Sequence, residues 1–491
     1  MTNRQRPTPS PIRHDMVDNH RPARLEIDRR AFVRSTLAQT AAWGIAGTSA
    51  TEVLLAQDAN AKSRSAGAPE VLLPRNRVPL SFVIDDSTCL VNMGHFCTPQ
   101  FAEAWPKREE YQKPWRTWPR EIPDAFVREF GQWCAEHGVR GKYSIVPYPA
   151  CVGWLDLEIP GWSRRELQAS LKLVRELMVP NWDIHPEMIT HTRVIDLKTG
   201  RPLAAINAGT MENSYPQEKK SVDELASYLA YALRILKRCE LPCEGITTPG
   251  GFGNLVKSEL PMAVDQAVRD VFQADLPHYF KYVRRGDQST EPLVENLRGI
   301  GTDDVRMTVN VPAGTGDWFG GWQGDSPSQP DRYANADASS GRMVELIERR
   351  QPAVMLCHWP GIYSNGSKDG FRAFQRIVLS LADRFGDQTL WMKLSEIGRY
   401  WAAKKVVEME REGNSIVMRT PVITPLFTIR IPGAAGPVRV RPLESGPQAA
   451  KPLREVASPA ALDAGTWVAE GTDLIVCVDL EGSGTRLEVG G

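Results

Sequence analysis

The chain has 491 residues, which exceeds one ordinary domain and predicts at least two folded units. Hydrophobic residues make up 42% of the sequence and charged residues 24%, as in soluble globular proteins. Because the 59 basic and 59 acidic residues cancel, the composition gives no indication of a nucleic-acid partner.

The sequence pattern of residues 1–61 predicts an export signal and a disordered leader, which we expect to pack against no other part of the protein. A pair of arginines at 29–30 followed by Phe32 resembles a twin-arginine signal, and Ala-Asn-Ala at 59–61 supplies a cleavage motif. The apolar stretch between them is too short and too polar to cross a bilayer, so we expect no transmembrane span. The alternative is a basic tail that continues into an amphipathic helix. The export interpretation places the protein in the periplasm or outside the cell.

In residues 75–405, strand-like and helix-like segments alternate. Such alternation predicts a parallel sheet covered by helices, and about seven units favour a closed (β/α)-barrel over an open sheet. The segment 182–192 follows a predicted helix, where the next strand or its loop is expected. The other expected strands are 78–86, 140–148, 243–248, 305–312, 352–359 and 389–394, and the expected helices are 124–138, 163–178, 221–239, 341–350 and 369–386.

The remaining residues, 406–491, have a different pattern. They alternate in hydropathy, are rich in Val, Ile and Thr, and are broken by Gly and Pro, without a convincing amphipathic helix. This pattern predicts a small all-β module, a sandwich of antiparallel strands.

Acidic and imidazole side chains gather where the predicted parallel strands end. Asp85 and Asp86 close the first strand, His185 and His191 lie in 182–192, and His358 ends an apolar strand. The carboxyl ends of barrel strands meet at one mouth, so we expect these side chains to lie together. A divalent metal would relieve the repulsion between the adjacent acids and take His185 and His191 as ligands. The alternative is that each histidine is an ordinary hydrogen-bonding loop residue.

In their order along the chain, these motifs resemble those of the polysaccharide deacetylases, metal-dependent carbohydrate esterases built on a distorted (β/α)-barrel. The first motif of that family is a strand ending in two aspartates, as VIDD does here. The resemblance implies that Asp85 is the general base and that Asp86 is a metal ligand. The second motif carries two metal-binding histidines, for which His185 and His191 are the candidates.

The other motifs imply an oxyanion donor and a general acid. The segment TTPGG resembles the third motif and implies the backbone N–H of Gly250 as the donor to the oxyanion. Asp317 and Trp318 resemble the acid–tryptophan pair of the fourth motif. A strand ending in His358 resembles the last motif and implies that this residue is the general acid. The resemblance covers residues 75–405.

Two departures from the family pattern concern the metal and the base. Five residues separate His185 from His191, where the family has three. Either the loop is rebuilt, or a different residue replaces one of these two histidines as a metal ligand. Thr247 stands where the family has an arginine that orients the catalytic aspartate. Glu187 and His191 would restore the three-residue gap. The alternative ligands are Glu187, Asp183 and His95.

The resemblance implies a metal-dependent hydrolase that removes N- or O-acetyl groups from a carbohydrate, with zinc as the expected ion. Flat aromatic faces suit the apolar side of a sugar ring, although each aromatic is also a candidate for an ordinary core or rim position. The candidate substrate-binding residues are Trp318, Trp322, Trp359 and Tyr363.

Two other functions remain open. One is a metal-independent glycoside hydrolase that uses Asp85 with Glu187 or Glu212. The other is a catalytically inactive carbohydrate-binding barrel, which Thr247 and the altered histidine spacing favour. The sequence does not indicate the sugar, the oligomeric state or a disulfide pairing for the eight cysteines.

Overall fold

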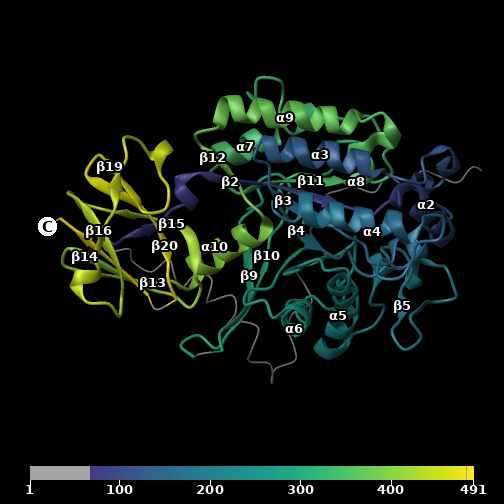
Figure 1. Cartoon of the computed structure of the whole chain (residues 1–491), viewed down its shortest axis with the longest axis horizontal. Helices are drawn as coiled ribbons and strands as arrows, with labels where there is room; N and C mark the ends of the chain where they lie inside the picture. Colours follow the sequence, from purple (N-terminus) through teal and green to yellow (C-terminus); the bar gives the residue numbers. More distant parts are fainter. Residues whose placement is uncertain (1–66, 303, 483, 491) are drawn as a thin grey trace, which may run out of the picture. The chain divides into compact units, whose positions relative to one another are not determined.

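The computed structural model describes residues 67–302, 304–482 and 484–490, and these form a mixed α/β architecture with several sheets (Figure 1). The predicted export signal and its cleavage motif lie outside the described residues. Within the described ranges, no helix has both the length and the hydropathy needed to cross a bilayer. All eight cysteines are described; seven are buried, and none forms a disulfide.

A parallel sheet contains the first and last predicted strands of the 75–405 region. Its strands run in the order β11-β2-β3-β4, and β12 pairs with the first residues of β2. Every residue of β2 is buried, as expected for a strand covered on both faces. The bounds are Val78–Asp85 (β2), Gly141–Ser144 (β3), Trp182–His185 (β4), Ala353–His358 (β11) and Thr389–Trp391 (β12).

A second sheet has the order β7-β8-β10-β9, in which only β9 runs antiparallel. Two narrow contacts connect it with the first sheet. Glu187, after β4, forms a parallel bridge with Thr247 in β7, and the N–H of Gly314, after β10, donates to the carbonyl of Val354 in β11 (2.9 Å). The bounds are Gly245–Thr247 (β7), His278–Phe280 (β8), Leu293–Arg298 (β9) and Arg306–Asn310 (β10).

Amphipathic helices cover the outer face of these strands. Phe82 of β2 stacks on Phe374 of α9 (4.3 Å between centroids) and contacts Phe130 of α3 (6.5 Å). Ser163 is the N-cap of α4 and Ser221 is the N-cap of α5, and each forms a capping box with a glutamate three residues later. The helix bounds are Met93–Ala104 (α2), Asp124–Glu136 (α3), Arg164–Leu173 (α4), Val222–Arg238 (α5), Leu260–Phe272 (α6), Arg342–Glu348 (α7), Trp359–Tyr363 (α8), Asp369–Phe385 (α9) and Leu394–Val406 (α10). The elements α2, α6, α8, β8 and β9 were not predicted from the sequence.

The opposite face of the same strands carries several polar side chains. Residues alternate along a strand, so the positions between the helix-facing ones carry Asp85, Lys142, Ser144 and His185, all of which are buried. The helix α10 contacts this polar face, because the N–H and the hydroxyl of Ser395 both donate to Asp183 (2.7 and 2.8 Å). A buried polar interior therefore connects the strand ends with α10.

The residues after α10 form two five-stranded sheets, of order β1-β15-β20-β19-β18 and β13-β14-β21-β16-β17, and nearly all of their pairings are antiparallel. The short strand β1, which precedes the parallel sheet in sequence, is an edge strand here. Tyr400 of α10 donates to the carbonyl of Leu72 (2.8 Å). The bounds are Glu70–Val71 (β1), Glu408–Glu412 (β13), Ser415–Arg419 (β14), Thr424–Ile431 (β15), Val438–Pro442 (β16), Lys451–Pro452 (β17), Arg454–Glu455 (β18), Thr466–Glu470 (β19), Asp473–Leu480 (β20) and Thr485–Val489 (β21).

Candidate functional site

Asp86, Glu187 and His191 converge beyond the ends of β2 and β4. His191 Nε2 lies 2.8 Å from Asp86 Oδ1 and 3.3 Å from Glu187 Oε1. The three potential ligand atoms lie within 4.8 Å of one another and could hold a metal ion. Asp86 and His191 therefore lie within ligand distance of a common point, as the sequence predicted, and Glu187, one of the alternative ligands, is the third member of the group.

Two of these three residues have an unusual backbone conformation. Asp86 has φ 57° and His191 has φ 63°, in the left-handed region, which costs a residue with a side chain about 1–3 kcal/mol. Hydrogen bonds from the backbone hold both: the N–H of Asp86 donates to Glu187 Oε2 (2.7 Å), and the N–H of His191 donates to Glu212 Oε2 (2.6 Å). Backbone strain at this position is typical of functional sites.

Glu212 organises the loop that carries His191. It is fully buried, and it accepts hydrogen bonds from the N–H groups of Ile189, Thr190 and His191 and from the hydroxyl of Tyr228. Burial raises the pKa of Glu212, and these hydrogen bonds oppose the shift. With both oxygens used in this way, Glu212 is an anchor for the loop and does not suit the role of a glycosidase acid or base.

The Asp86–Glu187–His191 group fits a bound cation. Asp86 Oδ1 is buried and has no hydrogen-bond donor, since its contact with His191 lacks hydrogen-bond geometry. Burial alone would lower the pKa of His191, but the charges of Asp86 and Glu187 outweigh it and raise that pKa well above its usual value. Two buried carboxylates thus require positive charge here. One imidazole and two carboxylates are a donor set that suits zinc and similar divalent ions.

Asp85 has its own cation. Its carboxylate pairs with the ammonium of Lys142 on β3, which is fully buried and also donates to the carbonyl of Ile84 (2.9 Å) and to Ser144 Oγ (2.8 Å). Burial raises the pKa of Asp85 to about 6, the charge of Glu187 adds to this, and Lys142 and His358 oppose it. Lys142 was not among the predicted site residues, and its only signal in the sequence is a lysine within the predicted strand 140–148. Lys142 supplies a positive charge next to Asp85, which the uncharged side chain of Thr247 cannot supply.

His358 ends β11 and pairs with Asp317, the acid of the predicted acid–tryptophan motif. His358 Nδ1 lies 2.8 Å from Asp317 Oδ2. Burial would lower the pKa of His358, but the hydrogen bond to Asp317 and the charges of Asp86 and Asp85 outweigh it and raise the pKa to about 9. The imidazole is therefore protonated at neutral pH.

Gly250 follows β7 in the TTPGG segment. It has φ +46°, and a Cβ at this position would lie 3.0 Å from the Cβ of Asn213. Both features favour glycine. Its N–H donates to no other group among the residues that the structure describes, so it is available to a ligand.

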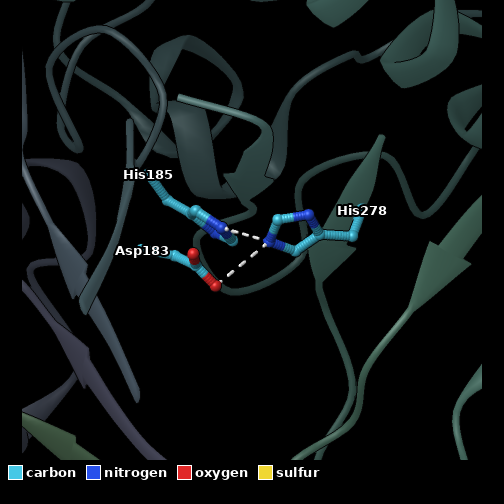
Figure 2. A group of neighbouring side chains, drawn as sticks. All are labelled: Asp183, His185 and His278. Carbon is cyan, nitrogen blue, oxygen red and sulfur yellow. Dashed lines mark hydrogen bonds and ion pairs between the residues drawn. The ribbon is translucent and has the colours of Figure 1, made fainter. Parts of the chain in front are cut away.

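His185 lies with other partners than those expected from the sequence. It ends β4 with its Nε2 2.9 Å from His278 Nε2, and the Asp86 group does not include it (Figure 2). Asp183, another alternative ligand, belongs to the same separate group. His95, the third alternative, is 3.0 Å from the carbonyl of Trp118 through Nδ1 and belongs to neither group. Glu187 therefore takes the place at the Asp86 group for which His185 was the candidate.

The four candidate substrate-binding aromatics lie in different surroundings. Trp359 is fully buried among the rings of Phe126, Phe130 and Tyr143, so it has no face for a ligand. Contacts of the other three are the Arg332 guanidinium over Trp318 (4.2 Å), Phe126 beside Tyr363 (4.9 Å), and Phe101 beside Trp322 (5.3 Å). Phe101 in turn lies 6.1 Å from the ring of His191. Contacts therefore connect Trp322 with the Asp86–Glu187–His191 group.

Comparisons with known proteins identify no family. No family model matches the chain, and no curated protein matches it. Among solved structures, one match is a mutant of a CE4 family pseudoenzyme with restored enzymatic activity, at 12% identity and a TM-score of 0.27, covering 66% of this chain and 68% of that one. Another is the α-fucosidase of Thermotoga maritima in complex with fucose, at 11% identity and a TM-score of 0.29, covering 85% and 97%. Likeness at these scores carries no argument about fold or activity.

Proposed function

We propose that the protein is a metal-dependent hydrolase that removes acetyl groups from a carbohydrate. The observation that carries this proposal is the convergence of Asp86, Glu187 and His191 next to two titratable groups with their own counter-charges. Those groups are Asp85, which is paired with Lys142, and His358, which is paired with Asp317.

The proposal assigns one role to each group. An ion bound by Asp86, Glu187 and His191 supplies polarisation of an acyl carbonyl and acidification of a water. Asp85 accepts the proton of the attacking water, and its raised pKa suits it to a reaction near neutral pH. His358, protonated at neutral pH, donates a proton to the departing amine or alcohol.

Two further groups orient the reactants in this scheme. The Gly250 N–H donates to the oxyanion that forms from the carbonyl. Asp317 orients the imidazole of His358 through Nδ1 and leaves Nε2 to face the substrate. Trp322 and its aromatic neighbours supply the flat surface on which a sugar ring stacks.

The proposal includes a distorted (β/α)-barrel of about seven strands across residues 75–405, with a separate β module at 406–491. The bridge from Glu187 to Thr247 and the hydrogen bond from Gly314 to Val354 support closure, because one connects β4 with β7 and the other connects the end of β10 with β11. Export to the periplasm or beyond stays a prediction from the sequence.

The test is acetate release from acetylated oligosaccharides by the purified, zinc-loaded protein. We expect release by the wild type, and in Asp86→Ala the loss of both the activity and the metal ion bound by the Asp86–Glu187–His191 group. Release of reducing sugars without acetate, unchanged after metal removal, would instead identify a metal-independent glycosidase. A folded, metal-loaded protein that binds these oligosaccharides without hydrolysis would identify an inactive binding barrel.

A further inference from the structure

A second group of potential ligands lies in the polar interior, on the facing sides of β4 and β8. Asp183 and His185 occupy alternate positions of β4, and His278 is the first residue of β8. His278 Nε2 lies 2.9 Å from His185 Nε2 and 3.6 Å from Asp183 Oδ2, and Figure 2 shows both contacts meeting at this one ring nitrogen. We propose that Asp183, His185 and His278 bind a divalent transition-metal ion at a site separate from the Asp86–Glu187–His191 group.

The spacing of the three donor atoms suits an ion of this class. Zinc lies about 2.0–2.2 Å from imidazole nitrogen and carboxylate oxygen, so two ligand atoms at tetrahedral or octahedral angles lie roughly 2.8–3.6 Å apart. The separations of 2.9 and 3.6 Å are close to the two ends of that range. All three atoms lie within 4.8 Å of one another. Two imidazoles and one carboxylate select zinc, iron or a similar metal over magnesium or calcium.

Neighbouring groups hold the ligands in this orientation. Asp183 accepts hydrogen bonds from the N–H (2.7 Å) and the hydroxyl (2.8 Å) of Ser395 at the start of α10. His185 Nδ1 lies 3.3 Å from Thr247 Oγ1, a suitable acceptor for the Nδ1 proton when Nε2 binds a metal. Such outer hydrogen bonds set ring orientation and tautomer in metal sites.

Gly245 of β7 leaves the space that the two rings occupy. A Cβ at this position would lie 2.4 Å from His185 Nε2 and 2.7 Å from His278 Nε2. Glycine weakens the interior of a strand, and its presence often marks a close approach of other groups. Here it allows two imidazoles from the strands on either side to meet across β7.

The competing account is a hydrogen bond between two neutral imidazoles. It would leave the largely buried Asp183, whose side chain is 13% exposed, without a cation, and buried carboxylates are normally paired or bound to metals. His278 Nδ1 has no partner in either account, so that atom does not discriminate. The bound ion accounts for the carboxylate as well as for both rings.

The experiment measures metal stoichiometry by elemental analysis on the full chain, in the wild type and in Asp86→Ala. We expect Asp86→Ala to lose metal from the Asp86 group but to keep one equivalent at the second site. Adding His278→Gln to this variant should remove the remaining equivalent. The control is His137→Gln in the same background, because His137 is the exposed C-cap residue that follows α3 and should not affect metal content.

A Co²⁺ spectrum and X-ray absorption of the Asp86→Ala protein provide a readout that needs no change at the site. We expect cobalt uptake with imidazole nitrogen and carboxylate oxygen as ligands. The inference is overturned if the folded Asp86→Ala protein takes up no Co²⁺, or if its metal survives His278→Gln. The experiment distinguishes this inference from the proposed function. A protein that releases acetate but whose Asp86→Ala variant holds no metal would support the function without the second site. A protein that releases no acetate but whose Asp86→Ala variant keeps one metal equivalent would support the second site without the function.

Discussion

His358 and Asp85 are register partners at the carboxyl ends of β11 and β2. Neighbouring parallel strands place side chains at the same register on the same face, so this pairing directs an imidazole and a carboxylate to one place. Asp317 holds the imidazole in its charged form, and burial keeps the pKa of the carboxylate near neutrality. Both pKa values are raised, so a carboxylate that can accept a proton lies beside a protonated imidazole at neutral pH, as an acid–base pair requires.

His358→Ala should lower the turnover of acetylated sugars by about 10²–10⁴-fold, the usual contribution of a positioned proton donor. Metal content should not change, because His358 is not in either group of potential ligands. Elemental analysis beside steady-state kinetics checks both parts. Loss of metal in this variant would make His358 a ligand, and unchanged turnover would exclude it as the general acid.

The alkaline limb of the pH profile should follow His358. Its pKa of about 9 in the folded protein means that the acid is protonated, and the enzyme active, below that pH, and that activity falls as the pH rises through it. Asp317→Asn removes the charge that raises this pKa, so the limb should move to lower pH. The measurement is kcat/KM against pH for both proteins, and an alkaline limb that does not move in the variant would exclude this assignment.

The same group contributes to stability over a defined pH range. The pKa of His358 is raised above the value of about 6.5 for an unfolded histidine, so its contribution is complete below that pH and is lost as the pH rises through about 9. Denaturant unfolding at pH 6 and pH 9.5 should therefore show a smaller stability difference in Asp317→Asn than in the wild type.

The sequence predicted most strands of the parallel region but not β8, because buried parallel strands are recognised as continuous apolar runs, as in Ala353–His358. It also predicted that Asp86 and His191 meet. It could not assign His185, because the end of β4 was unknown: β4 continues through His185, whose side chain therefore faces the interior with Asp183. Lys142 was missed for a similar reason, since a lysine in a strand usually marks a solvent-facing position.

The loop that carries His191 depends on contacts that no local pattern contains. Glu212 accepts three successive N–H groups from this loop, and it is 21 residues from His191 in sequence. The left-handed backbone of Asp86 and His191 is also set by such tertiary hydrogen bonds rather than by residue type. These are features that a single sequence does not indicate.

Glu212→Gln should destabilise the protein and weaken metal binding together. The amide group of glutamine would face N–H donors in place of a carboxylate oxygen, and leaving buried donors unpaired costs about 1–3 kcal/mol. Loss of the anchor for His191 should lower metal affinity about 10–100-fold. Denaturant unfolding and competition with a metal chelator measure the two effects. The control is Glu240→Gln, since the side chain of Glu240 is 78% exposed; equal effects of both variants would exclude the anchoring role.

Lys142→Met should leave Asp85 buried without its cation. Breaking one partner of a buried ion pair costs about 3–5 kcal/mol, and the pKa of Asp85 should rise further, because Lys142 opposes the effect of burial. Activity at neutral pH should fall, since a protonated Asp85 cannot accept a proton from water. Urea unfolding and kcat/KM at several pH values measure the two losses.

The double variant Lys142→Met/Asp85→Asn separates the structural role of the pair from its chemical role. With both charges removed, no buried charge is left unpaired, so stability should recover most of what Lys142→Met alone loses. Activity should not recover, because asparagine cannot act as the base. A double variant that regains activity would exclude Asp85 as the base. One that stays as unstable as the single variant would show that Lys142 contributes through its contacts with Ile84 and Ser144 rather than through its charge.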